Sequence, residues 1–223
     1  MDKRTAYAHV DHTQLKAVAA WSDIDKLCQE ARQYGMATVC IPPSFVNQAH
    51  QEYPDVKVCT VIGFPLGYNT TQTKVAEAVQ ALQEGAQEID MVVNLGDVKA
   101  GRFGRVTEEI RALKQAAGSR VLKVIVETCY LTQEEKVALC RCVTEGGADF
   151  IKTSTGFGTG GATMEDIELF KQHIGPNVKI KASGGIRTKE AIEAFLAAGV
   201  ERIGASGAIQ AFEGADTTAK GGY

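Results

Sequence analysis

The chain has 223 residues, of which 44% are hydrophobic and 23% are charged, a composition that excludes a disordered chain. Its formal net charge of −3 is spread without long blocks of one sign, which argues against a broad surface for nucleic acid or anionic membranes. No apolar run approaches the roughly 20 residues that span a bilayer, so we expect no membrane partner.

The six cysteines form no CxxC pair, and several of them stand in apolar runs, so we predict reduced thiols. The first residues, MDKRTAYAHVDHTQL, lack the apolar core of a signal peptide. Together these features predict a cytoplasmic protein.

Short runs rich in β-branched residues recur along the chain, and near-continuous apolar runs of this kind are typical of parallel strands that are covered on both faces. In chain order the predicted strands are a weak candidate at 6–13 and clearer ones at 36–41, 56–64, 88–96, 121–128, 148–154, 178–183 and 201–206.

Helix-like segments lie between these runs, and the clearest are at 71–86, 132–148 and 188–200. Each begins at a threonine, has apolar residues at helical spacing and stops at glycine. In the second segment Glu135 stands three residues after Thr132, which is the spacing of a capping box.

The predicted strands start about every 20 to 30 residues, which is the length of one βα unit. Eight such units predict a (β/α)₈ TIM barrel, and an open, doubly wound α/β sheet is the alternative. No linker divides the chain, so we predict one domain over residues 1–223 with a flexible tail from about residue 212.

Two lysines stand inside predicted strands, Lys152 in ADFIKTS and Lys181 in VKIKAS. Alternation places both on the inward face, near the strand ends where barrel enzymes carry their chemistry. A simple ion pair with Asp90 would also explain one buried lysine. Two such lysines on adjacent strands, each followed by a glycine loop, favour a function.

Two ammonium groups about 4 Å apart repel by roughly 4 kcal/mol at an effective dielectric near 20. Since one pKa unit is about 1.4 kcal/mol, this repulsion could lower the pKa of one lysine by up to about 3 units. A neutral amine could then attack a carbonyl at physiological pH. We expect Asp90 to keep Lys181 charged, to leave Lys152 as the neutral amine and to accept a proton.

Lys123 is a third strand lysine, for which we expect an ion pair with Glu127 or with an acid inside the barrel. Lys179 stands at the start of its strand and should reach solvent. Asp11 and Thr13 stand at the end of the first candidate strand, where capping of the helix-like segment TQLKAVAA and contact with substrate are equally good explanations.

Glycine-rich loops follow the last three predicted strands: TSTGFGTGG, SGGIR and GASG. Backbone N–H groups of such loops bind phosphate in this fold, and the first loop adds further N–H and hydroxyl donors. Glycines also form ordinary βα turns, but three such loops at one rim predict a small phosphorylated substrate.

Four segments, EIDMVVNLG, VLKVIVET, DFIKTSTGF and IKASGGIR, resemble in order and spacing the deoxyribose-phosphate aldolase family, over about residues 10–206. The resemblance implies a class I aldolase that cleaves 2-deoxy-D-ribose 5-phosphate to D-glyceraldehyde 3-phosphate and acetaldehyde, in deoxyribonucleoside catabolism, without a cofactor or metal. It implies Lys152 as the Schiff-base lysine, Lys181 as the second lysine and Asp90 as the proton relay.

The same resemblance implies a set of substrate-binding residues in the glycine loops and at the C-terminus. They are Thr155, Gly156, Gly184, Gly185, Ser206, Gly207 and Tyr223. Gly207 stands where some relatives have a second serine, and Tyr223 is the last residue of the chain. We also expect a homodimer, because barrels often pair through their outer helices.

Three alternatives compete with this interpretation. A zinc-dependent aldolase would need several imidazole or carboxylate ligands, and of the histidines only His9 and His12 are close in sequence. A sugar-phosphate isomerase or epimerase would use Lys152 as an electrostatic clamp. A non-catalytic module would use the lysines only to bind phosphate.

Overall fold

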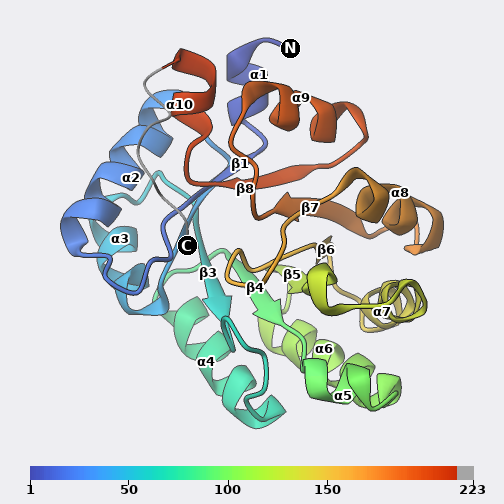
Figure 1. The fold of residues 1–223 in the computed structure, drawn as a ribbon. Coiled ribbons are helices and arrows are strands. Elements are labelled where there is room, and N and C mark those ends of the chain that lie inside the picture. The colour runs from blue at the N-terminus through green and yellow to red at the C-terminus, as the bar shows by residue number, and fades with distance from the viewer. Residues whose placement is uncertain (215–223) are drawn as a thin grey trace.

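Eight parallel strands close into a barrel in chain order, and the last strand pairs with the first, as the computed structural model shows (Figure 1). The predicted (β/α)₈ barrel is therefore confirmed, and the open sheet is wrong. The strands are β1 (Val10–Thr13), β2 (Thr38–Ile41), β3 (Val58–Ile62), β4 (Glu88–Val92), β5 (Val121–Ile125), β6 (Phe150–Lys152), β7 (Lys179–Ser183) and β8 (Arg202–Ala205).

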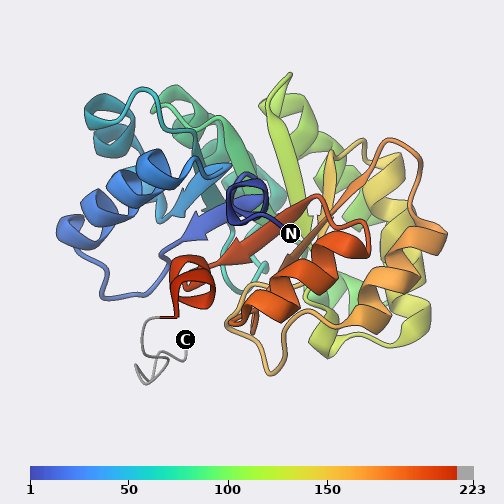
Figure 2. The ribbon, with the colours of Figure 1, turned by 90° about the horizontal axis from the view of Figure 1, so that it is seen from above.

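Helices surround the barrel on the outside (Figures 1 and 2). They are α1 (Lys3–Tyr7), α2 (Trp21–Tyr34), η1 (Pro43–Phe45), α3 (Val46–Glu52), α4 (Thr71–Gln83), α5 (Leu95–Lys99), α6 (Phe103–Ala117), η2 (Thr128–Tyr130), α7 (Gln133–Glu145), α8 (Met164–His173), α9 (Lys189–Ala197) and α10 (Ala208–Glu213).

The structure describes residues 1–214. Helix α10 extends to Glu213, so residues 212 and 213 are helical. The rest of the predicted tail, from residue 215 to Tyr223, lies outside the described residues. Within residues 1–214 no helix combines the length and the apolar character that crossing a membrane requires.

Threonine caps begin three helices where the sequence predicted a start. The side chain of Thr70 caps α4, that of Thr188 caps α9, and Thr132 and Glu135 form the predicted capping box at α7. These caps bind backbone N–H groups that a helix start leaves unpaired. Each helix therefore begins at a defined residue after its strand and packs back on the barrel.

The N-terminal strand is shorter than predicted, because Tyr7 belongs to α1 and the strand begins at Val10. The ring of Tyr7 packs edge-on against Tyr34 and Phe212, with ring centroids 5.3 Å apart in both pairs. These aromatic contacts, and the cap that Asp2 provides, favour a helical turn over an extended strand.

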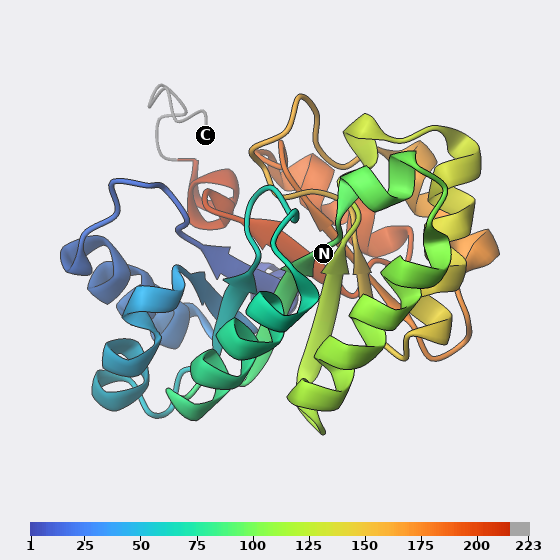
Figure 3. The same cartoon turned by 90° about the horizontal axis from the view of Figure 1, so that it is seen from below.

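Loops after the strands gather at one end of the barrel (Figure 3). The rings of Phe64, after β3, and Phe157, after β6, meet edge to face with centroids 5.3 Å apart. At Gly67 the β3–α4 loop passes so close to β4 that a Cβ would lie 2.0 Å from the carbonyl oxygen of Val93. Only glycine fits this contact.

We predict that Gly67→Ala destabilises the barrel much more than Gly101→Ala. Both glycines have left-handed backbone, with φ of 72° and 68°, but a Cβ at Gly101 would meet no atom within 4 Å. Urea unfolding should give a loss of about 1–2 kcal/mol for Gly101→Ala from backbone strain alone. The loss for Gly67→Ala should be larger by at least about 2 kcal/mol. Equal losses would show that the close approach to Val93 is unimportant.

Candidate active site

Two lysine amines share one carboxylate oxygen inside the barrel. Lys152 ends β6 and pairs in register with Lys181 in the middle of β7. The Nζ atoms of both lysines lie 2.7 Å from Oδ2 of Asp90, on β4. All three side chains are buried, so alternation and strand order together have brought the predicted residues into contact.

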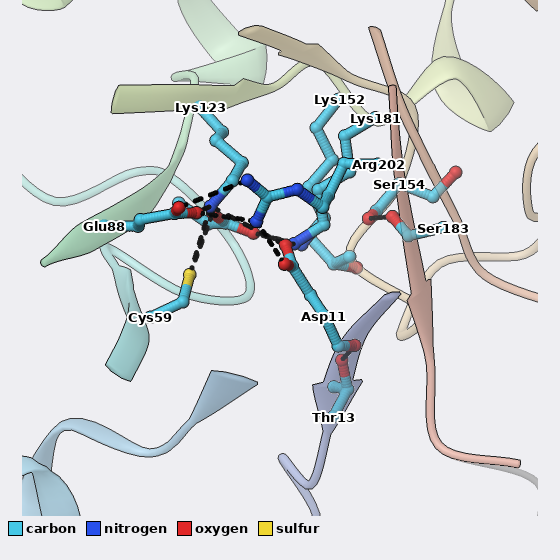
Figure 4. A network of polar contacts seen from close by, with 12 residues as sticks. Asp11, Thr13, Cys59, Glu88, Lys123, Lys152, Ser154, Lys181, Ser183 and Arg202 are labelled. Atoms are coloured by element: carbon cyan, nitrogen blue, oxygen red, sulfur yellow. Dashed lines mark hydrogen bonds and ion pairs between the residues drawn. The ribbon is translucent and has the colours of Figure 1, made fainter. Parts of the chain in front are cut away.

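Four more charged side chains complete what we call the lumen network, which consists of Asp11, Glu88, Asp90, Lys123, Lys152, Lys181 and Arg202 (Figure 4). The figure shows the four cationic side chains converging on the carboxylates. Lys123 Nζ lies 2.8 Å from Asp90 Oδ1 and 2.6 Å from Glu88 Oε2. Arg202 binds Asp11 at 2.6 Å and Glu88 at 3.0 Å.

The charged side chains point into the barrel because the residues that alternate with them in the strands pack outward, against the helices. Ile151, Ile180 and Ile203 belong to the apolar layer under the helices, so their neighbours in the strands face the barrel axis. On β8, Gly204 leaves room for its neighbours, since a Cβ there would lie 3.3 Å from Cε of Lys181. The interior is therefore polar, whereas most TIM barrels fill it with branched apolar side chains.

Mutual contact keeps the buried groups ionised. Burial alone would lower the pKa of Lys181, but the carboxylates of Asp11 and Asp90 outweigh it and raise that pKa above its ordinary value. Burial would likewise raise the pKa of Asp90, but Lys123, Lys152 and Lys181 hold it well below the usual range. The pKa of Lys123 is raised by its acidic neighbours despite burial.

The lumen network contains four cationic side chains and three carboxylates, so it carries one surplus positive charge when every group is ionised. A buried, uncompensated charge is costly, and the cost disappears if one lysine is neutral. Lys152 contacts one carboxylate, and it shares that oxygen with Lys181, whereas Lys123, Lys181 and Arg202 each contact at least two. Lys152 is thus the cation of the lumen network with the fewest carboxylate contacts.

Several residues of this network were not predicted, or were predicted for other roles. Asp11 caps no helix and lies too deep to touch a ligand in the cavity; it binds Lys181, Arg202 and the hydroxyl of Thr38. Lys123 pairs with acids inside the barrel, as one alternative predicted, and has no ion pair with Glu127. Lys179 is exposed, as predicted.

Glu88 and Arg202 were missed because they stand at strand starts, where a charged residue usually reaches solvent. Alternation could have identified Glu88, because it stands two residues before Asp90 and therefore lies on the same face of the strand. Arg202 is opposite Lys181 in the register of β7 and β8. That register becomes visible only when the barrel closes.

Two sets of buried donors could hold a metal by proximity, Cys40 with Cys59 and Asp90, and Asp11 with Cys59 and Glu88. Neither includes a histidine. In both sets the carboxylates already bind ammonium or guanidinium groups, and Lys123 Nζ lies 3.3 Å from Sγ of Cys59. The donor atoms are therefore already bound to lysine and arginine side chains, which a metal ion would have to displace. The six cysteines are free thiols.

A cavity opens above Lys152, between the loops that follow β6, β7 and β8. Its walls include the predicted residues Thr155, Gly156, Gly184, Gly185 and Ser206, together with Thr13, Leu15, Ser183, Ile186, Arg187, Gly204 and Ala205. Gly207 lies one residue beyond this wall, and Tyr223 falls outside the described residues. Thr13 thus faces the cavity, while its hydroxyl donates to the carbonyl of Asp11 at 2.8 Å.

The cavity joins an amine to a set of groups that suit phosphate. Gly184 and Gly185 both have left-handed backbone, with φ of 83° and 75°. A Cβ at Gly161 would lie 2.2 Å from the carbonyl oxygen of Gly184, so this close contact between the loops after β6 and β7 requires glycine at position 161. Arg187, which we did not predict, adds a guanidinium that can bind phosphate with two hydrogen bonds.

The loop after β6 does not offer all the donors that we expected. The backbone N–H of Thr155 donates to Oε1 of Glu127 at 3.1 Å, and its hydroxyl donates to Oε2 of the same carboxylate. Burial raises the pKa of Glu127, while these hydrogen bonds and the charge of Lys152 oppose that rise. Both donors of Thr155 are therefore occupied and unavailable to a phosphate.

Comparison with known proteins agrees with this geometry. The family model described as DeoC/LacD family aldolase matches residues 1–211. The chain belongs to the DeoC/LacD aldolase family.

The chain is 56% identical to deoxyribose-phosphate aldolase of Clostridium botulinum (strain Alaska E43 / Type E3) over 218 residues, 97% of this chain and 99% of the relative. It is 54% identical to the enzyme of that name from Clostridioides difficile (strain 630), over 94% of this chain and 96% of the relative. Among solved structures it resembles QR15, an aldolase, with a TM-score of 0.88 and 42% identity over 92% of both chains. It also resembles the tetrameric deoxyribose phosphate aldolase of Aeropyrum pernix, with a TM-score of 0.85 and 30% identity over 94% of this chain and 90% of that one.

We predict that Asp90→Asn strongly destabilises the protein, because it leaves Lys123, Lys152 and Lys181 with too little negative charge. Breaking a buried ion pair costs about 3–5 kcal/mol, which urea unfolding would measure. The exposed pair of Glu168 and Lys171 is a control, and Glu168→Gln should change the free energy of unfolding by at most about 0.5 kcal/mol. A loss below about 1 kcal/mol for Asp90→Asn would contradict the role of the lumen network.

Proposed function

We propose that this protein is a class I aldolase that reversibly cleaves 2-deoxy-D-ribose 5-phosphate to D-glyceraldehyde 3-phosphate and acetaldehyde, with Lys152 as the lysine that forms the Schiff base. The observation that carries the proposal is the pair of lysine amines on one oxygen of Asp90, directly below a cavity with glycine walls. Similarity to enzymes named deoxyribose-phosphate aldolase supports the substrate.

Cleavage begins when neutral Lys152 attacks the substrate aldehyde to give a carbinolamine, which loses water to form an iminium ion. The C3 hydroxyl then passes its proton to Asp90, directly or through solvent, and the C2–C3 bond breaks. The electron pair of that bond passes to the iminium, which becomes an enamine, and glyceraldehyde 3-phosphate leaves. The iminium is thus the electron sink, the role that a metal ion plays in other aldolases.

The enamine must then gain a proton at its terminal carbon to become the iminium of acetaldehyde, which water hydrolyses. Charged Lys181 and Asp90 are the groups beside Lys152 that can supply and take up protons, directly or through solvent. Because the pKa of Lys181 is raised and that of Asp90 is lowered, the two form a stable ammonium–carboxylate pair. Lys181 and Asp90 therefore return to these charges after each proton transfer.

The phosphate of the substrate lies, in this proposal, against the loops after β7 and β8. Gly184, Gly185 and Ser206 supply backbone and hydroxyl groups there, and Arg187 supplies charge. Gly207 and Tyr223 remain predictions for the same end of the substrate. Free thiols are consistent with our expectation of a cytoplasmic enzyme. A homodimer is also still a prediction, and the relative from Aeropyrum pernix is tetrameric.

Borohydride reduction in the presence of acetaldehyde tests the nucleophile directly. We expect mass spectrometry to find an N-ethyl group on Lys152, and Lys152→Ala to lower kcat for deoxyribose 5-phosphate by more than about 10⁴-fold. Lys179→Ala is the matched control, because this exposed lysine stands at the opposite end of the barrel and should leave activity within about twofold.

Turnover by Lys152→Ala, or an adduct on another lysine, would refute the proposal. Loss of wild-type activity after exhaustive chelation would favour the zinc-dependent alternative instead. Isomerase or epimerase activity without a trapped adduct would favour the second alternative, in which Lys152 only binds charge.

A further inference from the structure

Glu127 has an unusual backbone and a buried side chain next to the cavity. It directly follows β5, and it is the one non-glycine residue within residues 1–214 with positive φ, at φ 55° and ψ 65°. Left-handed backbone costs about 1–2 kcal/mol for such a residue. Its side chain is only 3% exposed, yet it has no ion pair among the described residues. Strain of this kind points to a function for the side chain that it positions.

Within residues 1–214 the carboxylate of Glu127 accepts hydrogen bonds from Thr155 alone, through the backbone N–H and the hydroxyl. An ionised carboxylate only accepts hydrogen bonds, so the hydroxyl hydrogen of Thr155 must point to Glu127. The backbone N–H of Phe157 donates to Oγ1 of Thr155 at 3.0 Å. A hydroxyl has one donor and two acceptor positions, so one acceptor position of Oγ1 is left.

Thr155 lines the cavity together with Lys152 and the glycines after β7. It therefore borders the same cavity as the amine and the proposed phosphate end. Since its two donors are held by Glu127, what its hydroxyl can still offer is an acceptor. An acceptor repels phosphate oxygens and attracts a hydroxyl that donates.

We propose that Glu127 is a specificity-determining residue that, by fixing the direction of the Thr155 hydroxyl, makes the site select an aldehyde with a hydroxyl group on the carbon next to its carbonyl. Glu127 acts through Thr155 and is a positioning residue. This inference rests on the proposed function, because it assumes that the phosphorylated acceptor aldehyde lies between Lys152 and the glycine loops.

The test compares two phosphorylated acceptors with acetaldehyde as donor. Glyceraldehyde 3-phosphate has the hydroxyl, and 3-oxopropyl phosphate lacks it. For the wild type we expect kcat/KM to favour glyceraldehyde 3-phosphate by about tenfold or more, because the analogue leaves Oγ1 of Thr155 without a hydrogen-bond donor. A wild-type ratio near one would overturn the inference.

Glu127→Gln keeps the shape of the side chain but adds donors, so the Thr155 hydroxyl can turn in either direction. We expect the ratio to fall to about threefold or less. Thr155→Val removes the acceptor and should bring the ratio close to one, and Glu127→Gln/Thr155→Val should give the ratio of Thr155→Val alone. Glu134→Gln, on the exposed first turn of α7, is the control and should keep the wild-type ratio.

If Glu127→Gln does not fold, Glu127→Gly offers a second route, because glycine relieves the positive φ and removes the carboxylate. Its ratio should also fall. An equal loss of kcat/KM for both acceptors, with the ratio unchanged, would mean that Glu127 has only a structural role. Borohydride trapping of acetaldehyde on Lys152 in the same variants tests the proposed function separately. A failure of the inference about Glu127 can therefore be told apart from a failure of the proposed function.

Discussion

One carboxylate oxygen that binds two lysine amines is the contact on which the site depends. Oδ2 of Asp90 holds Lys152 and Lys181 together inside a closed barrel, where both side chains are buried. The arrangement is not a source of stability by itself, because replacing a buried ionic cluster with apolar side chains is often neutral or stabilising. Its consequence is electrostatic: four cationic side chains and three carboxylates share one enclosed space, so Lys152 shares its one carboxylate with a second cation.

The loops at the rim above this network differ in the polar groups that they present to the cavity. The loops after β7 and β8 have glycine backbone and Arg187 for an anion, whereas the loop after β6 is turned inward by Glu127 and presents an acceptor. In the proposed site, phosphate binding and selection of the acceptor hydroxyl therefore belong to different parts of one cavity. The amine of Lys152 stands at its base, where both parts can orient the substrate carbonyl.

The sequence predicted the barrel, its helix caps and the contact of Lys152, Lys181 and Asp90. These depend on local patterns, on alternation within strands and on neighbouring strands being consecutive in the chain. Asp11 and Arg202 could not be predicted in the same way. Their contact joins the first strand to the last, 191 residues apart, and exists only because the barrel closes. The bonds of Thr155 to Glu127 depend on loop conformation, for which the sequence offers no regular period.

The most direct test of the account is the pH dependence of the rate at which Lys152 forms the borohydride-trapped adduct, in the wild type and in Lys181→Met. If a surplus of one cation keeps the amine of Lys152 neutral, the wild type should react at neutral pH. Lys181→Met, in which charges are balanced with Lys152 protonated, should react only as pH rises toward the ordinary lysine value of about 10.4. Identical profiles, or a wild-type amine that stays protonated until about pH 10, would contradict it.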